Sequence, residues 1–265
     1  MTEEDILDLR EVYRIPIPII GVPIPGRNNP IAVINSNNTI DIYGKIGIGR
    51  RCDLRIEGGV RVRRDIIRTL IRFFERLSEE LGVDMCIRIS LSYDTREILY
   101  LPLYMIITTA VTSRIVGEVD PIDLAKSMIV IDRSLGLNSS HAEGVRFSIA
   151  ERMSIAFRRG DEIIKLPDPG TLSLTMKLVR HVKLREIPST LLENEIGDLV
   201  TKLVGYTALK SIQSIREGDL DRFMRYLEIE RRLWTLLYDM PRSRCYYVYD
   251  EWGRAACISI SSQKH

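Results

Sequence analysis

A small set of polar side chains has the residue types that binding or acid–base chemistry needs. Arg27 and Asn28 lie in PGRNNP, where a guanidinium and an amide could bind an anion or a substrate carboxylate. Asp94 and Glu97 could form a carboxylate pair for proton transfer, and His141 lies in the polar segment NSSHAEG, where it could contact a substrate. Each has a structural alternative: a polar turn whose arginine pairs with an acid, a capping box before a helix, and a surface histidine. No Ser-His-Asp set can be assembled, so the catalytic residues stay unassigned.

Glycines mark places where the backbone could approach a ligand closely. Gly44, Gly47 and Gly49 punctuate the segment IDIYGKIGIG, and Lys45 lies among them. Gly144 follows in the loop segment HAEG. Lys45, Gly47 and Gly144 are therefore further ligand-binding candidates, although strand bulges explain the first group of glycines equally well.

The charge balance does not indicate a nucleic-acid-binding protein. The chain has 38 Lys and Arg against 36 Asp and Glu, a net charge of +2. The densest basic region has arginines at positions 50, 51, 55, 61, 63 and 64, and this Arg50–Arg64 cluster could contact phosphates of RNA or DNA. Acidic residues are plentiful and few aromatic side chains are near for base stacking, so a solvated, ion-paired face is the favoured interpretation.

Cysteine usage and hydropathy exclude several other classes of protein. Cys52, Cys86, Cys245 and Cys257 lie far apart without a C-x-x-C pair, so neither a zinc site nor a disulfide framework is expected, and no cofactor is indicated. No apolar run reaches the roughly 18 to 20 residues that a bilayer span needs. The acidic start MTEEDILDLREVYR is the opposite of a secretory signal. We expect a soluble, cytoplasmic protein without membrane contact.

The elements that must position these residues predict an α+β protein. Helices are expected over 64–81, 101–116, 190–214 and 219–238 and from Pro121, and strand-like runs at 31–36, 39–49, 52–59, 84–92, 172–182 and around Trp252. The stretch 141–167 predicts a helix or strand, then a hairpin turning at Arg159-Gly160. Alternate prolines in YRIPIPII predict an edge or irregular segment at 13–20. Because LPDPG at 166–170 is a strong breaker, we expect two lobes, 1–170 and 171–265.

Four segments in collinear order carry a resemblance to a known family. They are PGRNNP at 25–30, IDIYGKIGIGRRCDLRIEGG at 40–59, the helical stretch 197–234, and DEWGRAACISIS at 250–261. Together they resemble the GHMP-kinase superfamily and, within it, beta-ribofuranosylaminobenzene 5'-phosphate synthase of the tetrahydromethanopterin pathway, over about residues 23 to 260. The resemblance implies two lobes, a left-handed βαβ unit and a ligand cleft. It also implies ATP-dependent phosphoryl transfer or the attack of 4-hydroxybenzoate on phosphoribosyl pyrophosphate, and an archaeal-like origin.

Two departures from the family pattern affect its phosphate chemistry. In the family, a loop rich in Gly and Ser holds phosphates on backbone N–H groups before the long helix. The corresponding stretch here is SYDTREILYLPLYM at 92–105, which has no glycine. In the last motif, Asp250 and Glu251 replace neutral donors. We therefore expect lost or altered phosphate chemistry and a role as a binding or interaction subunit, in a homo- or hetero-oligomer.

Two other functions stay open. A re-tooled transferase or small-molecule kinase would bind a small phosphorylated or aromatic-acid ligand in the cleft through Arg27, Lys45 and His141. Alternatively, the Arg50–Arg64 cluster would contact nucleic acid.

The apolar run after Glu97 has two interpretations. Ile98, Leu99, Tyr100, Leu101 and Leu103 would form an exposed apolar patch if the family's ligand loop were kept. Such a patch would be covered by a second chain, or by the N-terminal Ile-Pro segment of the same chain. In the other interpretation these residues complete the core of the first lobe.

Overall fold

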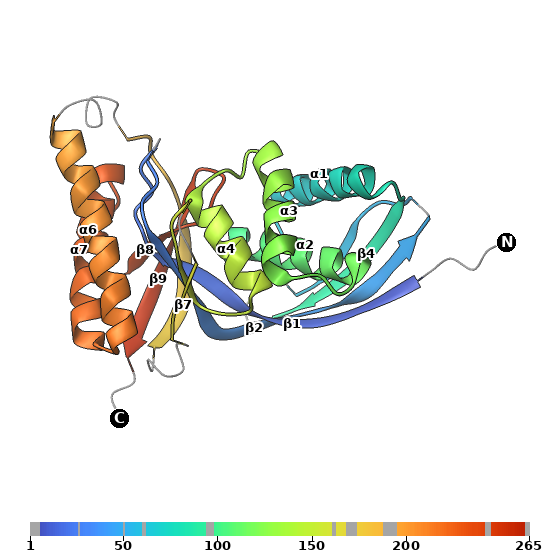
Figure 1. Cartoon of the computed structure of the whole chain (residues 1–265), viewed down its shortest axis with the longest axis horizontal. Helices are drawn as coiled ribbons and strands as arrows, with labels where there is room; N and C mark the ends of the chain where they lie inside the picture. Colours follow the sequence, from blue (N-terminus) through green and yellow to red (C-terminus); the bar gives the residue numbers. More distant parts are fainter. Residues whose placement is uncertain are drawn as a thin grey trace. The chain divides into compact units, whose positions relative to one another are not determined.

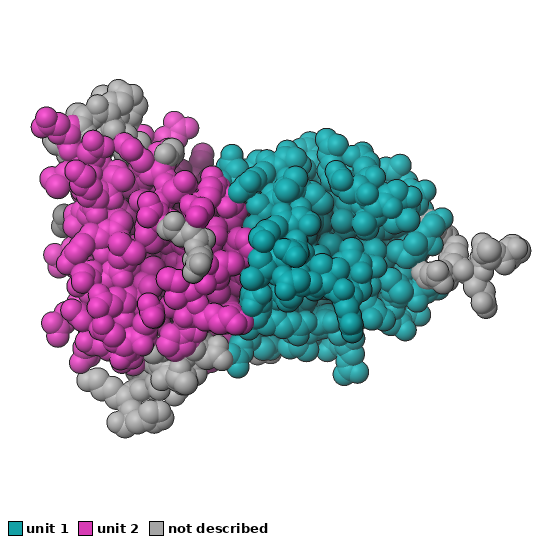
Figure 2. Space-filling view, viewed as in Figure 1, with its two compact units in different colours: residues 1–15, 38–138, 149–152 teal, residues 16–37, 139–148, 153–265 magenta. Residues whose placement is uncertain are grey.

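A computed structural model describes residues 6–25, 27–49, 51–59, 62–93, 98–160, 163–167, 174–187, 195–241 and 245–262. The chain forms two compact units, coloured separately in Figure 2. Unit 1 comprises residues 1–15, 38–138 and 149–152, and unit 2 comprises 16–37, 139–148 and 153–265. This division does not follow the expected pair of lobes, 1–170 and 171–265. Strands β1 (Ile6–Ile20) and β2 (Ile31–Ile48) each contribute residues to both units.

Unit 1 contains a mixed sheet. Strand β4 (Met85–Ser92) pairs antiparallel with residues 41–48 of β2 and parallel with β3 (Arg55–Gly58). Strand β1 pairs with β2 off the main strand path, as alternate prolines predict for an edge. Gly44 allows the backbones of β2 and β4 to approach each other closely, because a Cβ at this position would lie 2.2 Å from the carbonyl oxygen of Arg88 on β4. Close approach of two backbones therefore explains this glycine.

Three helices lie on the same face of this sheet (Figure 1). Helix α1 (Arg64–Leu81) connects β3 to β4 and ends at Gly82 in the left-handed conformation, as the sequence predicts. Helix α2 (Tyr100–Val116) is buried from Leu101 through Thr112, which makes it the central helix of the unit. Helix α3 (Pro121–Ser134) begins at Asp120, whose carboxylate accepts hydrogen bonds from two backbone N–H groups of the first turn.

Unit 2 contains an antiparallel sheet in the order β7-β9-β8, formed by β7 (Leu174–Lys183), β8 (Tyr246–Tyr249) and β9 (Arg254–Ser262). Helices α6 (Glu195–Glu217) and α7 (Leu220–Tyr238) pack against each other and share a core with this sheet. Helix α4 (Ser140–Ala150) and the short strands β5 (Ile155–Phe157) and β6 (Ile164–Lys165) complete the described elements. Strand β5 pairs with β2 at Ile31–Val33, and the predicted hairpin at Arg159-Gly160 joins β5 to β6.

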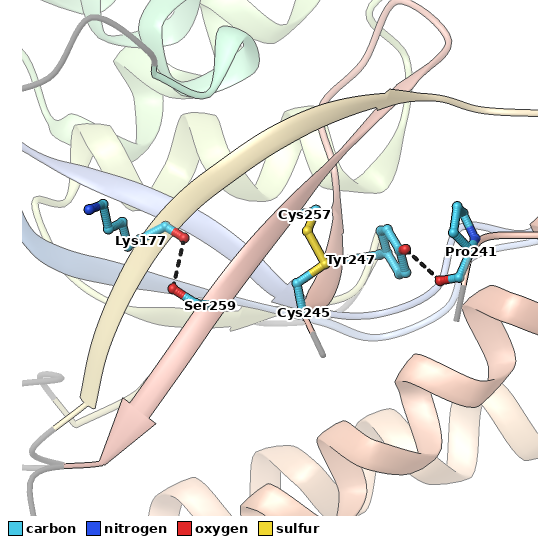
Figure 3. Close-up of a disulfide and its surroundings, with 6 residues drawn as sticks. All are labelled: Lys177, Pro241, Cys245, Tyr247, Cys257 and Ser259. Carbon is cyan, nitrogen blue, oxygen red and sulfur yellow. Dashed lines mark hydrogen bonds between the residues drawn. A yellow bond between two sulfur atoms is a disulfide. The ribbon is translucent and has the colours of Figure 1, made fainter. Parts of the chain in front are cut away.

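The expectation that the cysteines form no disulfide framework is wrong. Cys52 is bonded to Cys86, and Cys245 to Cys257, with Cα atoms 4.8 and 5.5 Å apart. Figure 3 shows the second disulfide beside Tyr247, whose hydroxyl donates to the carbonyl of Pro241 at 2.7 Å. The pairing of strands brings these sulfur atoms together, and the spacing of the cysteines along the chain does not reveal which strands pair.

Neither a membrane-spanning helix nor a metal-binding group of side chains is present among the residues that the structure describes. None of the described helices is long and apolar enough to cross a membrane. Among the residues described, no three or more His, Cys, Asp or Glu side chains are grouped so that they could hold a metal ion.

Candidate functional site

The start of α2 corresponds to the segment where the resemblance places phosphate binding. Its N-cap is Leu99, whose side chain makes no capping hydrogen bond. The third helical residue is Pro102, which has no N–H, so this position of the first turn has no backbone donor for an anion. Asp94 and Glu97, the candidate carboxylate pair, lie outside the described residues.

The apolar residues at this helix start belong to the core of unit 1. Ile98, Leu99, Leu101 and Leu103 are 2%, 3%, 0% and 0% exposed, so these side chains are unavailable to a second chain. Tyr100 is partly buried, and the guanidinium of Arg63 lies 5.3 Å from the centre of its ring. The core interpretation therefore replaces the interface interpretation, because this run continues directly into the buried helix α2.

A hollow of about 1050 Å³ opens elsewhere in unit 1. Its lining includes Asp53 before β3, Phe74 and Glu79 on α1, and Met85 at the start of β4. It therefore lies at the beginning of the parallel strands β3 and β4, whereas the segment that resembles a phosphate loop follows the end of β4.

Arg27 and Asn28 make contacts within unit 2. The guanidinium of Arg27 lies 3.1 Å from a carboxylate oxygen of Asp198, and both side chains are at least half exposed. The carbonyl of Asn28 accepts a hydrogen bond from Arg158 at 3.3 Å. These contacts match the structural alternative for Arg27, a polar turn whose arginine pairs with an acid.

Lys45 and Gly47 lie on β2 in unit 1. Lys45 is exposed and directly opposite Arg88 on β4, which in turn is opposite Arg55 on β3. We call these three residues the basic row. Like charges at opposite positions of neighbouring strands repel each other, so the row favours an anion. Gly47 has no comparable constraint, because a Cβ there would be 3.6 Å from its nearest neighbour.

The structural alternative for the ligand-binding candidate His141, a surface histidine, is wrong. His141 is the second residue of α4 and is 3% exposed, and its Nε2 lies 2.6 Å from the carbonyl oxygen of Gly21, to which it donates. Burial lowers the pKa of His141 to about 4, so the imidazole is neutral at pH 7. On the same helix, a Cβ at Gly144 would lie 2.5 Å from the terminal Cδ1 atom of Ile31, so that side chain would have to shift. Both residues thus serve the packing of α4.

A buried carboxyl contacts the other side of Gly21. The N–H of Gly21 donates to both carboxyl oxygens of Glu230 on α7, at 3.2 and 3.1 Å. Burial raises the pKa of Glu230 to about 8, because desolvation outweighs the hydrogen bond from Gly21. The Gly21 cluster, formed by Gly21, His141 and Glu230, is therefore uncharged at neutral pH. The sequence contains a signal for Glu230: it occupies a core position of the apolar pattern Phe223, Leu227, Leu233 and Leu237.

The carboxylates of the last motif also have partners within unit 2. Asp250 is fully buried, with a carboxylate oxygen 3.1 Å from Nδ1 of His181. Glu251 accepts hydrogen bonds from the hydroxyls of Ser139 and of Tyr249, the latter at 3.1 Å. Burial together with the nearby Glu251 carboxylate raises the pKa of Tyr249. Both carboxylates therefore lie against polar side chains of unit 2.

Comparison with known proteins identifies the fold. Neither the models of protein families nor the sequences of curated proteins match this chain. Among solved structures, mevalonate kinase from L. major in complex with R-mevalonate is similar with a TM-score of 0.66 and 9% identity, over 98% of this chain and 90% of that one. Phosphomevalonate kinase from Streptococcus pneumoniae has a TM-score of 0.60 and 11% identity, over 96% and 92%. Homoserine kinase from Cytophaga hutchinsonii has a TM-score of 0.56 and 13% identity, over 99% and 87%.

These structures belong to the GHMP-kinase superfamily, so the chain has the GHMP-kinase fold. At identities of 9 to 13% the similarity concerns the fold alone.

Proposed function

We propose that this protein is a GHMP-kinase-fold subunit with lost or altered phosphate chemistry, which acts through binding another molecule and works in the cytoplasm. The observation that carries the proposal is the start of α2, where Pro102 removes a backbone donor and the side chains of Leu99 and Leu101 are buried. An anion site at a helix start needs free N–H groups that the ligand can reach. The resemblance to beta-ribofuranosylaminobenzene 5'-phosphate synthase then concerns ancestry more than present activity.

The internal contacts of two candidates argue against a working enzyme. Arg27 already pairs with Asp198, and His141 donates to the carbonyl of Gly21 in a buried position. A re-tooled transferase or kinase would have to break both contacts to bind a phosphosugar or an aromatic acid through these side chains. Breaking a buried hydrogen bond costs about 1–3 kcal/mol for the group left unsatisfied.

Calorimetry with Mg-ATP, phosphoribosyl pyrophosphate and 4-hydroxybenzoate tests the proposal. We expect Mg-ATP to bind no better than millimolar, about −4 kcal/mol. A matched variant, Val130→Glu on the exposed face of α3, controls for heats from a surface substitution. Micromolar binding of Mg-ATP that substitutions at 94–97 abolish and Val130→Glu preserves would refute the loss of phosphate chemistry.

The basic row favours a second candidate function, contact with the phosphates of a single-stranded nucleic acid. Its three cations lie at one level of three neighbouring strands, so they could bind successive phosphates. Three such contacts predict a slope of about −2 when log affinity is plotted against log salt concentration. The pair Lys45→Gln and Arg88→Gln should reduce this slope, whereas Arg76→Gln on α1, where Arg76 pairs with Glu79 at 2.9 Å, should not. An unchanged slope in the double variant would exclude this candidate.

A further inference from the structure

The two disulfides have different surroundings. Cys245 and Cys257 are 7% and 2% exposed and belong to the core of unit 2, together with Trp234. Cys52 and Cys86 are both partly exposed. A thiol dissolved in water must reach a sulfur atom in order to attack it. Of the two disulfides, Cys52–Cys86 is therefore the one that is more open to exchange with such a thiol.

Cys86 lies on the open face of the unit 1 sheet, by which we mean the face turned away from α1. Its neighbours on β4, Met85 and Ile87, are buried and line the hollow together with Phe74 of α1. Because successive side chains of a strand point to opposite faces, Cys86 points away from α1. Directly opposite Cys86 on β2 is Gly47, which has no side chain to cover this position. A small molecule in solution can therefore approach Cys86 from the open face.

The other cysteine belongs to the wall of the hollow. Residues 51–54 join β2 to β3 without regular secondary structure, and all four line the hollow. Before this segment, the N–H of Gly49 donates to the carbonyl of Asp84 at 2.9 Å. After it, the pairing of β3 with β4 begins at Arg55. The segment is thus held by backbone contacts at its two ends and by the disulfide from Cys52 to β4 between them.

We infer that Cys52–Cys86 is a thiol–disulfide exchange site, through which small thiols control the wall of the hollow. A thiolate attacks the Sγ of Cys86, a new S–S bond forms, and Cys52 leaves as a thiolate that takes up a proton. A second thiol group then attacks the mixed disulfide and releases Cys86. The net products are two cysteine thiols and one oxidised small-molecule disulfide. This inference goes beyond the proposed function and does not depend on it.

The released state should differ from the bonded state mainly at the wall. The pairing of β2 and β3 with β4 consists of backbone contacts, which the exchange leaves in place. The Sγ of Cys52 lies 3.4 Å from the carbonyl oxygen of Asp53, so the released thiol has an acceptor within its own segment. Loss of the disulfide therefore frees residues 51–54, while the α1 side of the hollow stays as it is.

Reduction of the full-length chain with dithiothreitol, a neutral dithiol, tests the exchange. Samples taken over time are alkylated with iodoacetamide, and mass spectrometry of the peptides measures each cysteine separately. Cys52 and Cys86 should become alkylated together, at least about tenfold faster than Cys245 and Cys257, because a thiol can reach them. The circular dichroism of the protein should stay unchanged during this first phase.

A variant that covers Cys86 makes the test specific. A Cβ at Gly47 would lie 3.6 Å from the Cβ of Cys86, so Gly47→Val fits and shields one side of that residue. It should slow the alkylation of Cys52 and Cys86 severalfold. Gly59→Val is the matched control, because a Cβ there would meet nothing within 4 Å, and it should leave the rate unchanged.

Hydrogen exchange measures whether the wall is released. The amides of residues 51–54 should exchange faster after reduction, and re-oxidation with oxidised glutathione should slow them again. The double variant Cys52→Ser, Cys86→Ser should exchange like the reduced parent and should not respond to dithiothreitol.

Three results would overturn the inference: equal alkylation rates for the two disulfides, the same hydrogen exchange at 51–54 in both states, or a loss of circular dichroism when Cys52–Cys86 is reduced. The last result would make this disulfide a structural cross-link. Calorimetry with Mg-ATP is read separately, because micromolar binding refutes the lost phosphate chemistry alone.

Discussion

Replacing Glu230 by Gln should remove the fall in stability that the parent shows as the pH rises from about 6.5 to 8. Glu230 is 3% exposed, its carboxyl accepts from the N–H of Gly21, and burial raises its pKa to about 8 from 4.5. Because the folded-state pKa is the higher one, the carboxyl stabilises the fold fully below pH 4.5. This stability is lost progressively as the pH rises through 8. Gln keeps an oxygen that can accept from Gly21 but has no proton to lose.

The magnitude follows from the shift of the pKa. The pKa of Glu230 is higher in the folded state than in the unfolded state by about 3.5 (8 − 4.5). The unfolding free energy should therefore fall by at most about 5 kcal/mol between pH 4 and pH 9, with a slope of up to about 1.4 kcal/mol per pH unit. His141 acts in the opposite direction, because its pKa is lowered from 6.5 to about 4, so its contribution is lost as the pH falls from 6.5 through 4. Stability of unit 2 should therefore be greatest at about pH 5 to 6.

Urea unfolding at a series of pH values, followed by tryptophan fluorescence, measures this effect. Trp234 lies one helical turn after Glu230 and is buried, so its emission reports on the same part of unit 2. The difference in unfolding free energy between Glu230→Gln and the parent should grow in favour of the variant as the pH rises from 5 to 9.

Glu228→Gln is the matched control. Glu228 lies on the same helix but is partly exposed, and its hydrogen bond from Arg231 lowers the pKa of its carboxyl. Its substitution should leave the slope between pH 5 and 8 unchanged. A difference between Glu230→Gln and the parent that stays constant over this range would refute the buried, protonated carboxyl.

The remaining predictions concern packing and cross-links. Breaking Cys52–Cys86 or Cys245–Cys257, which join residues 34 and 12 positions apart, should each cost about 3–4 kcal/mol by loop entropy. Melting curves of the Cys→Ser pairs measure this, and no change would contradict the cross-links. Gly44→Ala should cost more than about 2 kcal/mol because its Cβ would meet the Arg88 carbonyl, while Gly47→Ala should cost under 1 kcal/mol. Equal urea midpoints for the two glycine variants would show that close approach does not matter. Leu101→Ala should lose about 2–5 kcal/mol without changing the oligomeric state, and an altered assembly would restore the interface interpretation.

The sequence determined the elements whose stability is local. Helix α1 follows from apolar residues recurring along one face and from Gly82 at its end, and α3 follows from Asp120 and Pro121 at its beginning. The hairpin at Arg159-Gly160 and the α6–α7 pair follow from local signals in the same way. The fold class was also predicted, because the order of helices and strands restricts how layers can pack.

Only the tertiary structure decided what lies together across long separations. Cys52 and Cys86 meet because β3 and β4 pair in parallel, and no spacing along the chain encodes that register. His141 is buried because α4 packs where Gly21 offers a carbonyl, 120 residues earlier in the sequence. The same side chain is an exposed base or a buried hydrogen-bond donor according to which backbone faces it. Burial and the direction of each pKa shift are therefore properties of packing, and the local sequence specifies neither.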